Sequence, residues 1–264
     1  FKSTIGGTWY DGYYMYYNIK QYWNAENLAV SNMGESSEFS NQWTWTNILS
    51  YDKTFGDHKI AVVGGYESNE LGNGRHVEGQ RSGFFSDAVD YRALGNGASI
   101  LGTNSWQNTP VSLVSLFAKA DYGFKNKYLL SATVRRDGSS VFGEANRYGV
   151  FPSFSGAWRV GDEAFLDGLD WLSDLKIRGS WGTMGNQLAV NPANAFYLYG
   201  GDAGSSFYDI NGAMTSSVQG MRPTRIGNSD AKWESNVTTD IGFEAQLFKS
   251  KFGIVFDWYS KQTK

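Results

Sequence analysis

The stretch WESNVTTDIGFEAQL, which spans Trp233–Leu247, decides the fold class. From Val237 onward its odd positions are mostly apolar and its even positions are polar, so alternation with a period of two continues over most of its length. Neighbouring side chains of an extended strand point to opposite faces, so this segment has one apolar face and one polar face. The stretch therefore predicts a long β-strand and not a helix.

The same alternation recurs along the chain and predicts about nine strands in total. The segments are longer than the roughly 5–6 residues usual for globular strands, and they reach the roughly 9–11 residues that a tilted strand needs to cross a bilayer. The clearest further segments are residues 112–124, 127–137, 149–160, 173–183 and 251–261. Weaker patterns cover residues 5–17, 39–53 and 59–71.

The connections between these segments alternate between short and long. Tight turns are expected at residues 54–58, 125–126 and 249–250, and long loops at residues 72–111 and 184–232. Two connections of intermediate length cover residues 138–148 and 161–172, and the second contains a short apolar and acidic stretch that favours a helical turn. In an antiparallel meander alternate connections lie at opposite ends, and short turns at one end with long loops at the other are typical of transmembrane β-barrels. Residues 39–53 then run toward the periplasm, and Lys264 lies near the outer rim.

The composition narrows the classes of function. The chain has 264 residues, 23 basic and 26 acidic side chains and a net charge of -3, so it offers no attractive field for nucleic acid. It has no cysteine and only two histidines, so a disulfide framework or a thiolate metal site is excluded. Aromatic residues make up 16% while the mean hydropathy is -0.41, and no apolar run reaches the roughly 18 residues of a transmembrane helix. The first residues lack both an initiator Met and the layout of a signal peptide, so we expect a processed chain or a fragment.

Several aromatic residues lie near the predicted strand ends, where a membrane interface favours them. Tyr122, Phe124 and Tyr128 flank one predicted periplasmic turn, and Trp258 and Tyr259 lie toward the opposite end of their strand. Amphipathic rings favour both interfaces of a membrane. Soluble antiparallel sheets also alternate, so a soluble domain with an aromatic core remains an alternative at this point.

Four blocks of sequence follow one another over about half of the chain. They are Tyr128–Ser140 (YLLSATVRRDGSS), Asn146–Ser153 with Ala157–Arg159, Leu172–Arg178 with Gly185–Gln187, and Trp233–Glu234 with Thr239–Phe243. In this order the blocks resemble the SusC/RagA family of TonB-dependent outer-membrane transporters, and the stretch Thr44–Tyr66 is compatible with an earlier barrel hairpin of that family.

The resemblance implies an all-β fold, an antiparallel up-and-down transmembrane β-barrel that holds a plug and has about 22 strands. It implies import of glycan or peptide fragments across the outer membrane of Bacteroidota, with TonB as energy source and a SusD-like surface lipoprotein as partner. No enzymatic activity, catalytic residue, metal or cofactor is implied. We find no plug, no TonB-contacting segment and no closing strand, and an open sheet edge is not tolerated in lipid. Residues 1–264 are therefore expected to be part of the barrel domain of a larger protein.

The two long loops carry the candidate ligand contacts, because loops on a rigid barrel commonly hold binding residues. Rings stack on sugar faces, and amide and guanidinium groups bind hydroxyl or peptide groups. The alternative is that these rings pack the loops against each other or against the lipoprotein. The candidates are Arg75, Tyr91, Arg92, Trp106, Asn186, Tyr197, Tyr199 and Tyr208. The same loops also carry His76, Arg81, Phe84, Phe85, Gln187, Asn194, Asp209 and Arg222.

Other polar groups are interpreted as structural. The acidic residues between Asp162 and Asp174 do not have the spacing of a calcium loop and are expected in a solvated turn, and His58 and His76 are also expected to be solvated. A soluble carbohydrate-binding or adhesin-type β domain is the alternative function, and an all-β glycosidase is the weakest, because no carboxylate pair stands out. The polar faces of the strands are expected to pair across strands or with the plug through Lys119, Asp121, Arg135, Lys176, Arg178, Asp240 and Glu244.

Overall fold

The structure is a computed structural model that describes residues 1–264 except 24–25, 189, 192–193, 195, 203 and 213–216. Nine strands follow one another in a single sheet, and a tenth, β6 (Gly97–Gln107), pairs with β5 beside this path. In sheet order the nine are β1 (Lys2–Asn18), β4 (Asn32–Phe55), β5 (His58–Phe84), β7 (Val111–Phe124), β8 (Tyr128–Ser139), β9 (Tyr148–Arg159), β10 (Leu172–Asn186), β13 (Glu234–Leu247) and β14 (Phe252–Thr263). The expected antiparallel meander of about nine long strands is confirmed.

Short elements occupy the connections. Two small hairpins, β2 (Gln21–Trp23) with β3 (Glu26–Leu28) and β11 (Leu198–Gly200) with β12 (Arg222–Arg225), form separate two-stranded sheets. Five 3₁₀ turns complete the list: η1 (Val89–Tyr91), η2 (Leu94–Asn96), η3 (Glu144–Asn146), η4 (Val160–Asp162) and η5 (Ala164–Leu166). Among the described residues, no helix has the length and apolar character needed to span a membrane.

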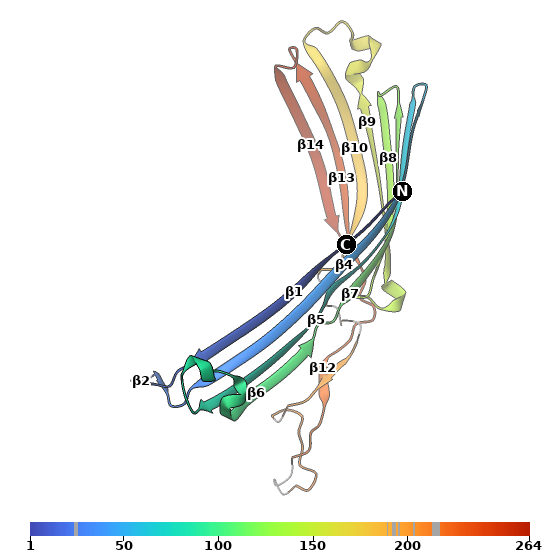
Figure 1. Cartoon of the computed structure of the whole chain (residues 1–264). Helices are drawn as coiled ribbons and strands as arrows, with labels where there is room; N and C mark the ends of the chain where they lie inside the picture. Colours follow the sequence, from blue (N-terminus) through green and yellow to red (C-terminus); the bar gives the residue numbers. More distant parts are fainter. Residues whose placement is uncertain (24–25, 189, 192–193, 195, 203, 213–216) are drawn as a thin grey trace. The chain divides into compact units, whose positions relative to one another are not determined.

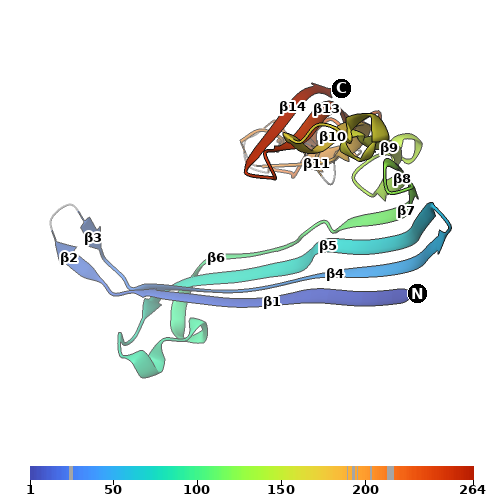
Figure 2. The ribbon, with the colours of Figure 1, turned by 90° about the horizontal axis from the view of Figure 1, so that it is seen from above.

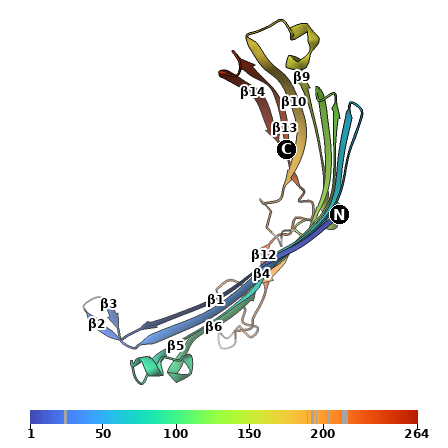
Figure 3. The same cartoon turned by 45° about the horizontal axis from the view of Figure 1, so that its top comes forward.

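The chain divides into two compact units. The first unit comprises residues 1–4, 45–68 and 112–264, and the second comprises residues 5–44 and 69–111. In the first unit β8, β9, β10, β13 and β14 lie side by side as curved neighbours (Figures 1 and 3). In the second unit β1, β4, β5 and β6 run alongside one another (Figure 2).

A large apolar core is missing from the described residues. The buried apolar side chains are few, and they lie at loop bases and strand ends more than between layers. They are Met33, Val141, Phe142, Phe151, Val160 and Ala245. Many large apolar side chains are instead exposed, among them Ile241 at 55% and Trp258 at 54%. A soluble sandwich would bury such faces between two sheets, so the apolar face of this single layer requires another apolar environment.

The turns agree with the prediction at one end of the strands. Lys125 and Asn126, between β7 and β8, have φ values of 52° and 55°, which is the pattern of a type I′ hairpin turn. Gly56 has a φ of 57° in the β4–β5 turn. The connection 161–172 contains η4 and η5, so the expected helical turn is also confirmed.

The prediction of a long loop over residues 72–111 is wrong. Strand β5 continues to Phe84 and pairs with β6 from Arg75↔Gln107 to Phe84↔Gly97, so only the tip of this segment is a loop. Gly72 and Gly83 have φ values of 73° and 76°, which shows that these glycines adjust the strand without ending it. Glycine and asparagine in this segment suggested a loop because they are rare inside ordinary strands.

Candidate functional site

The apolar face of the first unit is continuous across three strands. Register places Ile177 of β10 opposite Phe243 of β13, which in turn lies opposite Phe256 of β14. The two phenylalanine rings stack with centroids 5.7 Å apart, and Ile241 pairs with Trp258 in the next layer. Alternation therefore aligns the apolar side chains of neighbouring strands on one surface.

A row of rings crosses the ends of five strands at the short-turn end of the same face. Neighbouring ring centroids lie 5.4 Å apart for Phe55–His58, 4.9 Å for His58–Phe124, 6.3 Å for Phe124–Tyr128 and 6.2 Å for Tyr128–Trp158. His58 Nδ1 also lies 2.7 Å from the Tyr122 hydroxyl. The side chain of His58 remains partly exposed, and strands distant in sequence place rings beside it. We call the row Phe55, His58, Phe124, Tyr128 and Trp158 the aromatic girdle.

One carboxylate connects the girdle to the link between β9 and β10. Glu163 accepts hydrogen bonds from the Tyr128 hydroxyl at 2.7 Å and from Trp158 Nε1 at 3.1 Å. The ammonium group of Lys127 lies 3.3 Å from the second carboxylate oxygen. The hydrogen bond from Tyr128, together with those from Trp158 and Lys127, lowers the pKa of Glu163 below its ordinary value. Glu163 was expected in a solvated turn, so this expectation is wrong for its side chain.

The opposite face of the same strands carries an ion-pair network centred on Arg178. Its guanidinium lies 2.7 Å from Asp257, 3.1 Å from Glu244 and 3.6 Å from Asp240. Lys176 adds a second cation 3.6 Å from Glu244. The network joins β10, β13 and β14, so the expected cross-strand pairing of this face is confirmed here.

A second polar cluster lies on β4, β5, β7 and β8. Arg135 binds Asp137 at 2.7 Å, Ser115 at 2.8 Å and Glu67 at 3.3 Å, and Glu67 also accepts a hydrogen bond from Thr46. Lys119 and Asp121 form an ion pair of 3.0 Å along β7.

An open hollow of about 420 Å³ lies on this polar face. Its polar lining residues come from β5, β7, β8, β9, β10, β13 and the β7–β8 turn, and they include Asp121, Ser131, Ser155, Lys176, Arg178 and Asp240. Polar side chains that pair with one another still have oxygen atoms and N–H groups that can form further hydrogen bonds at the surface. The hollow therefore suits contact with water, a polar ligand or another polar protein segment.

The second unit holds four predicted ligand contacts, and its contacts explain two of them. Arg92 lies 4.6 Å above the Tyr17 ring and donates two hydrogen bonds to the Asp87 carbonyl, so it fixes the loop between β5 and β6. The hydroxyl of Tyr17 donates to the Asp87 carboxylate at 2.8 Å, and this bond lowers the pKa of Asp87. Tyr91 packs edge-on against Phe85.

Arg75 and Trp106 lie on paired strands and not on a loop. Arg75 of β5 is exposed, and Trp106 of β6 stacks on His76 with ring centroids 3.9 Å apart. His76 also lies 3.8 Å from Glu38 and 3.6 Å from Glu78, and its side chain is only 15% exposed. The expectation that His76 is solvated is therefore wrong. Glu38 and Trp106 come from other strands, which the local sequence does not reveal.

The first unit holds the other four candidates. Asn186 ends β10 and donates to Glu234 at 3.2 Å while its side-chain oxygen accepts from the backbone of Leu188, so it closes the strand end. Tyr197, Tyr199 and Tyr208 are 59%, 63% and 55% exposed. These three rings are thus available to a ligand in the structure, whereas Asn186 has a structural role.

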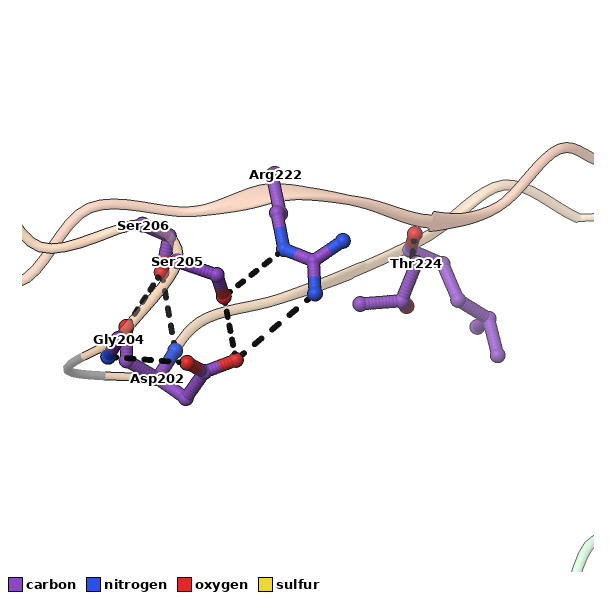
Figure 4. Close-up of polar contacts among 7 residues, drawn as sticks. Asp202, Gly204, Ser205, Ser206, Arg222 and Thr224 are labelled. Carbon is purple, nitrogen blue, oxygen red and sulfur yellow. Dashed lines mark hydrogen bonds and ion pairs between the residues drawn. The ribbon is translucent and has the colours of Figure 1, made fainter.

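A polar cluster at the loop end of the β11–β12 hairpin, which we call the polar knot, was missed at the level of sequence (Figure 4). Asp202 accepts hydrogen bonds from the Gly204 backbone and the Ser205 hydroxyl, and the Arg222 guanidinium binds Ser205 at 3.1 Å and Asp202 at 3.8 Å. The Ser205 hydroxyl is the main cause of the lowered pKa of Asp202. Aspartate followed by glycine and serine is a turn signal that marks this position. Arg222, a predicted loop candidate, thus ties the start of β12 to the turn that follows β11.

Within the described part of the chain, no group of three or more histidine and acidic side chains is arranged to hold a metal ion. A single-layered antiparallel sheet, with a lipid-compatible face bordered by an aromatic girdle and a polar face on its other side, defines the wall of an outer-membrane β-barrel.

Comparison with known proteins identifies the kind of barrel. The profile of the family described as TonB dependent receptor-like, β-barrel, matches residues 2–264. TonB-dependent receptor P3 of Formosa agariphila is 34% identical over 241 residues, which are 90% of this chain and 23% of that protein. TonB-dependent receptor SusC of Bacteroides thetaiotaomicron is 26% identical over 99% of this chain and 25% of its own length. The chain therefore belongs to the TonB-dependent receptor β-barrel family, an outer-membrane family whose members are receptors and transporters and not enzymes.

A solved structure agrees on the fold. The structure of the RagAB peptide transporter matches with a TM-score of 0.85 and 22% identity, over 99% of this chain and 28% of that one. The chain thus spans about a quarter of the length of the curated relatives that it matches. The predicted resemblance to the SusC/RagA type, the outer-membrane location and the β-barrel fold are confirmed.

Proposed function

We propose that residues 1–264 form one arc of the barrel wall of a TonB-powered outer-membrane importer that takes up glycan or peptide fragments together with a SusD-like surface lipoprotein. The observation that carries the proposal is the division of the first unit into a lipid-compatible face and a charged, hollowed face on the same strands. A lumen that passes hydrophilic cargo requires a polar lining inside an apolar belt.

The edges of the sheet support a role as part of a larger barrel. In the described part of the chain β1 and β14 each have one neighbour, so each presents a row of backbone groups without partners in the sheet. Such groups cost several kcal/mol each in hydrocarbon, so both edges require further strands in the membrane. The plug, the TonB-contacting segment and these strands would belong to the same transporter.

Exposed rings in the first unit support ligand contact. Tyr197, Tyr199 and Tyr208 lie on the long connection between β10 and β13, at the end of the strands opposite the short turns. Aromatic faces stack on sugar rings and on peptide side chains alike, so the rings fit both proposed substrate classes. The alternative, a soluble carbohydrate-binding or adhesin-type domain, uses the same rings, but it does not account for the exposed apolar face bordered by the girdle.

The decisive test uses the intact transporter with its lipoprotein partner. Binding of fluorescent oligosaccharide and peptide libraries is measured in detergent, and uptake is measured in cells with and without TonB. We expect one substrate class to bind and its uptake to require TonB. Recovery of the protein as a water-soluble monomer, or uptake that is unchanged without TonB, would reject the importer.

A matched pair of variants separates ligand contact from loop structure. The double substitution Tyr197→Ala/Tyr199→Ala removes two exposed rings, and we expect about a tenfold weaker affinity, which corresponds to about 1.4 kcal/mol. Met221→Ala is the control, because Met221 is a 71% exposed apolar side chain on the same connection without a ring. Equal losses in both variants would show that the rings have no specific contact with the ligand.

A further inference from the structure

The link between β9 and β10 has a threefold internal pattern. Backbone N–H groups of Leu166, Leu169 and Leu172 donate to the carbonyl groups of Glu163, Leu166 and Leu169, so three successive hydrogen bonds each span three residues. The 3₁₀ geometry itself ends with η5 at Leu166, and separate turns continue to Leu172. The sequence EAFLDGLDWL, residues 163–172, repeats three kinds of residue at a spacing of three.

The three sets of residues differ in chemistry and exposure. One consists of Glu163 and three leucines at 166, 169 and 172, all intermediate or at the border of exposure. A second has Ala164 followed by acidic residues at 167 and 170, all exposed. The third contains Phe165 and Trp171, which are 68% and 50% exposed. We call the exposed rings Phe165 and Trp171 the ring side of the link.

Glu163 fixes the link against the apolar face of the barrel wall. Its carboxylate accepts from Tyr128 and Trp158, both members of the aromatic girdle. The first residue of the link, Val160, is 7% exposed, and the Glu163 backbone donates to its carbonyl group. The link therefore begins at the border of the lipid-facing surface, where rings mark the membrane interface.

We propose that the ring side of residues 160–172 inserts into the interfacial region of the periplasmic leaflet and binds phospholipid there, so that the link is a membrane-surface anchor continuous with the girdle. Two large exposed rings on a link that is hydrogen-bonded to the girdle suit the headgroup boundary, where amphipathic surfaces lie about 5–10 Å deep. The exposed carboxylates of Asp167 and Asp170 then remain in water. This role goes beyond transport, because it concerns how the wall is held in the bilayer.

The test uses spin labels on single cysteines in the full-length transporter reconstituted in phospholipid vesicles, with any cysteine outside residues 1–264 replaced by serine. Residues 1–264 contain no cysteine, so each introduced thiol is the one labelled site of this segment. Labels are placed by Phe165→Cys and Trp171→Cys on the ring side. Asp167→Cys is the matched aqueous control on the same link, and Ile241→Cys is the control for the lipid-facing strand surface.

Accessibility to oxygen, which partitions into lipid, is compared with accessibility to a water-soluble nickel complex. We expect the oxygen-to-nickel ratio at 165 and 171 to exceed that at 167 several-fold and to stay below that at 241. Ratios at 165 and 171 equal to that at 167 would overturn the proposal in favour of an exposed periplasmic surface. Low accessibility to both reagents at 165 and 171 would also overturn it, because it would indicate that another protein segment covers the rings. The measurement requires no substrate and no TonB, so its failure is distinct from failure of the proposed transport.

Discussion

The two faces of β10, β13 and β14 share one backbone and differ in almost every other respect. One face presents Ile241, Phe243 and Phe256 in an exposed apolar layer, and the other holds Arg178 among three carboxylates. The first is stable only when hydrocarbon covers it, whereas the second is stabilised by its own ion pairs and by water. The comparison shows that the loss of stability caused by a substitution depends on whether hydrocarbon or water covers the substituted face. It depends less on which strand carries the residue.

The largest effect is expected for a charge on the lipid-facing layer. Ile241→Arg places a guanidinium among Trp258 and its apolar neighbours, and a cation near the bilayer midplane costs about 2–4 kcal/mol in such barrels. The expected result is a lower yield of heat-modifiable, folded transporter in vesicles and a lower unfolding midpoint in urea. Ser180→Lys, on the polar face opposite Asp240, is the matched control and is expected to change stability by no more than about 0.5 kcal/mol. Equal costs for the two would contradict the assignment of the faces.

The second-largest loss of stability is expected when the central cation of the polar face is removed. Arg178→Ala leaves Asp240, Glu244 and Asp257 close together with Lys176 as the remaining cation, and because the guanidinium is about one-third exposed we expect a loss of about 2 kcal/mol. The free energy of unfolding is measured in urea for the full-length protein. Arg178→Lys keeps the charge and is expected to recover part of the loss. A variant as stable as the original would mean that the carboxylates are paired elsewhere.

At the end of the apolar face, Glu163 should make stability depend on pH. Its pKa is lowered from an ordinary value near 4.5, so its contribution is fully present above 4.5 and disappears as the pH falls through the lower folded value. Glu163→Gln is expected to lower the unfolding midpoint at pH 7 and to reduce the change in midpoint between pH 7 and pH 3. Asp167→Asn is the control on the same link. If Glu163→Gln retains the full pH dependence, other carboxylates are responsible for it.

The smallest global effect is expected at the polar knot, where water surrounds every group. Arg222→Ala removes the bonds to Ser205 and Asp202, and an exposed ion pair contributes no more than about 1 kcal/mol. The unfolding midpoint should therefore stay nearly constant, while amide exchange around residues 204–206 becomes faster. Unchanged exchange in this segment would show that the backbone turn alone maintains the knot.

Much of the barrel wall was predictable because the alternation of apolar and polar residues depends only on neighbours along the chain. The even positions of β13 that suggested a polar face do pair with Lys176 and Arg178, and the tight turn at Lys125–Asn126 lies where the polar pair between two alternating segments indicated it. Strand existence, turn position and face assignment all follow from neighbours along the chain.

The candidate site was predicted less well because its contacts join distant segments. The Tyr17 hydroxyl donates a hydrogen bond to Asp87, which lies 70 residues away along the chain, and Arg92 lies over the Tyr17 ring. Arg92 was predicted to contact a ligand, but these contacts give it a structural role. His58 meets Tyr122 across 64 residues. The glycines near residues 72–83 suggested a loop, since sequence alone does not separate a bulge in a continuing strand from the end of that strand.

The length of β5 has a consequence for the cell surface. Its 27 residues far exceed the roughly 9–11 that a tilted strand needs to cross a bilayer, and β6 pairs with the part beyond Gly74. A stretch that would otherwise be a long flexible loop therefore has its backbone hydrogen bonds satisfied by neighbouring strands. Proteases cleave chains that enter their active sites as unpaired extended segments, so a paired ribbon of this kind withstands digestion at an exposed position, and the tip between β5 and β6 remains as the short segment open to attack.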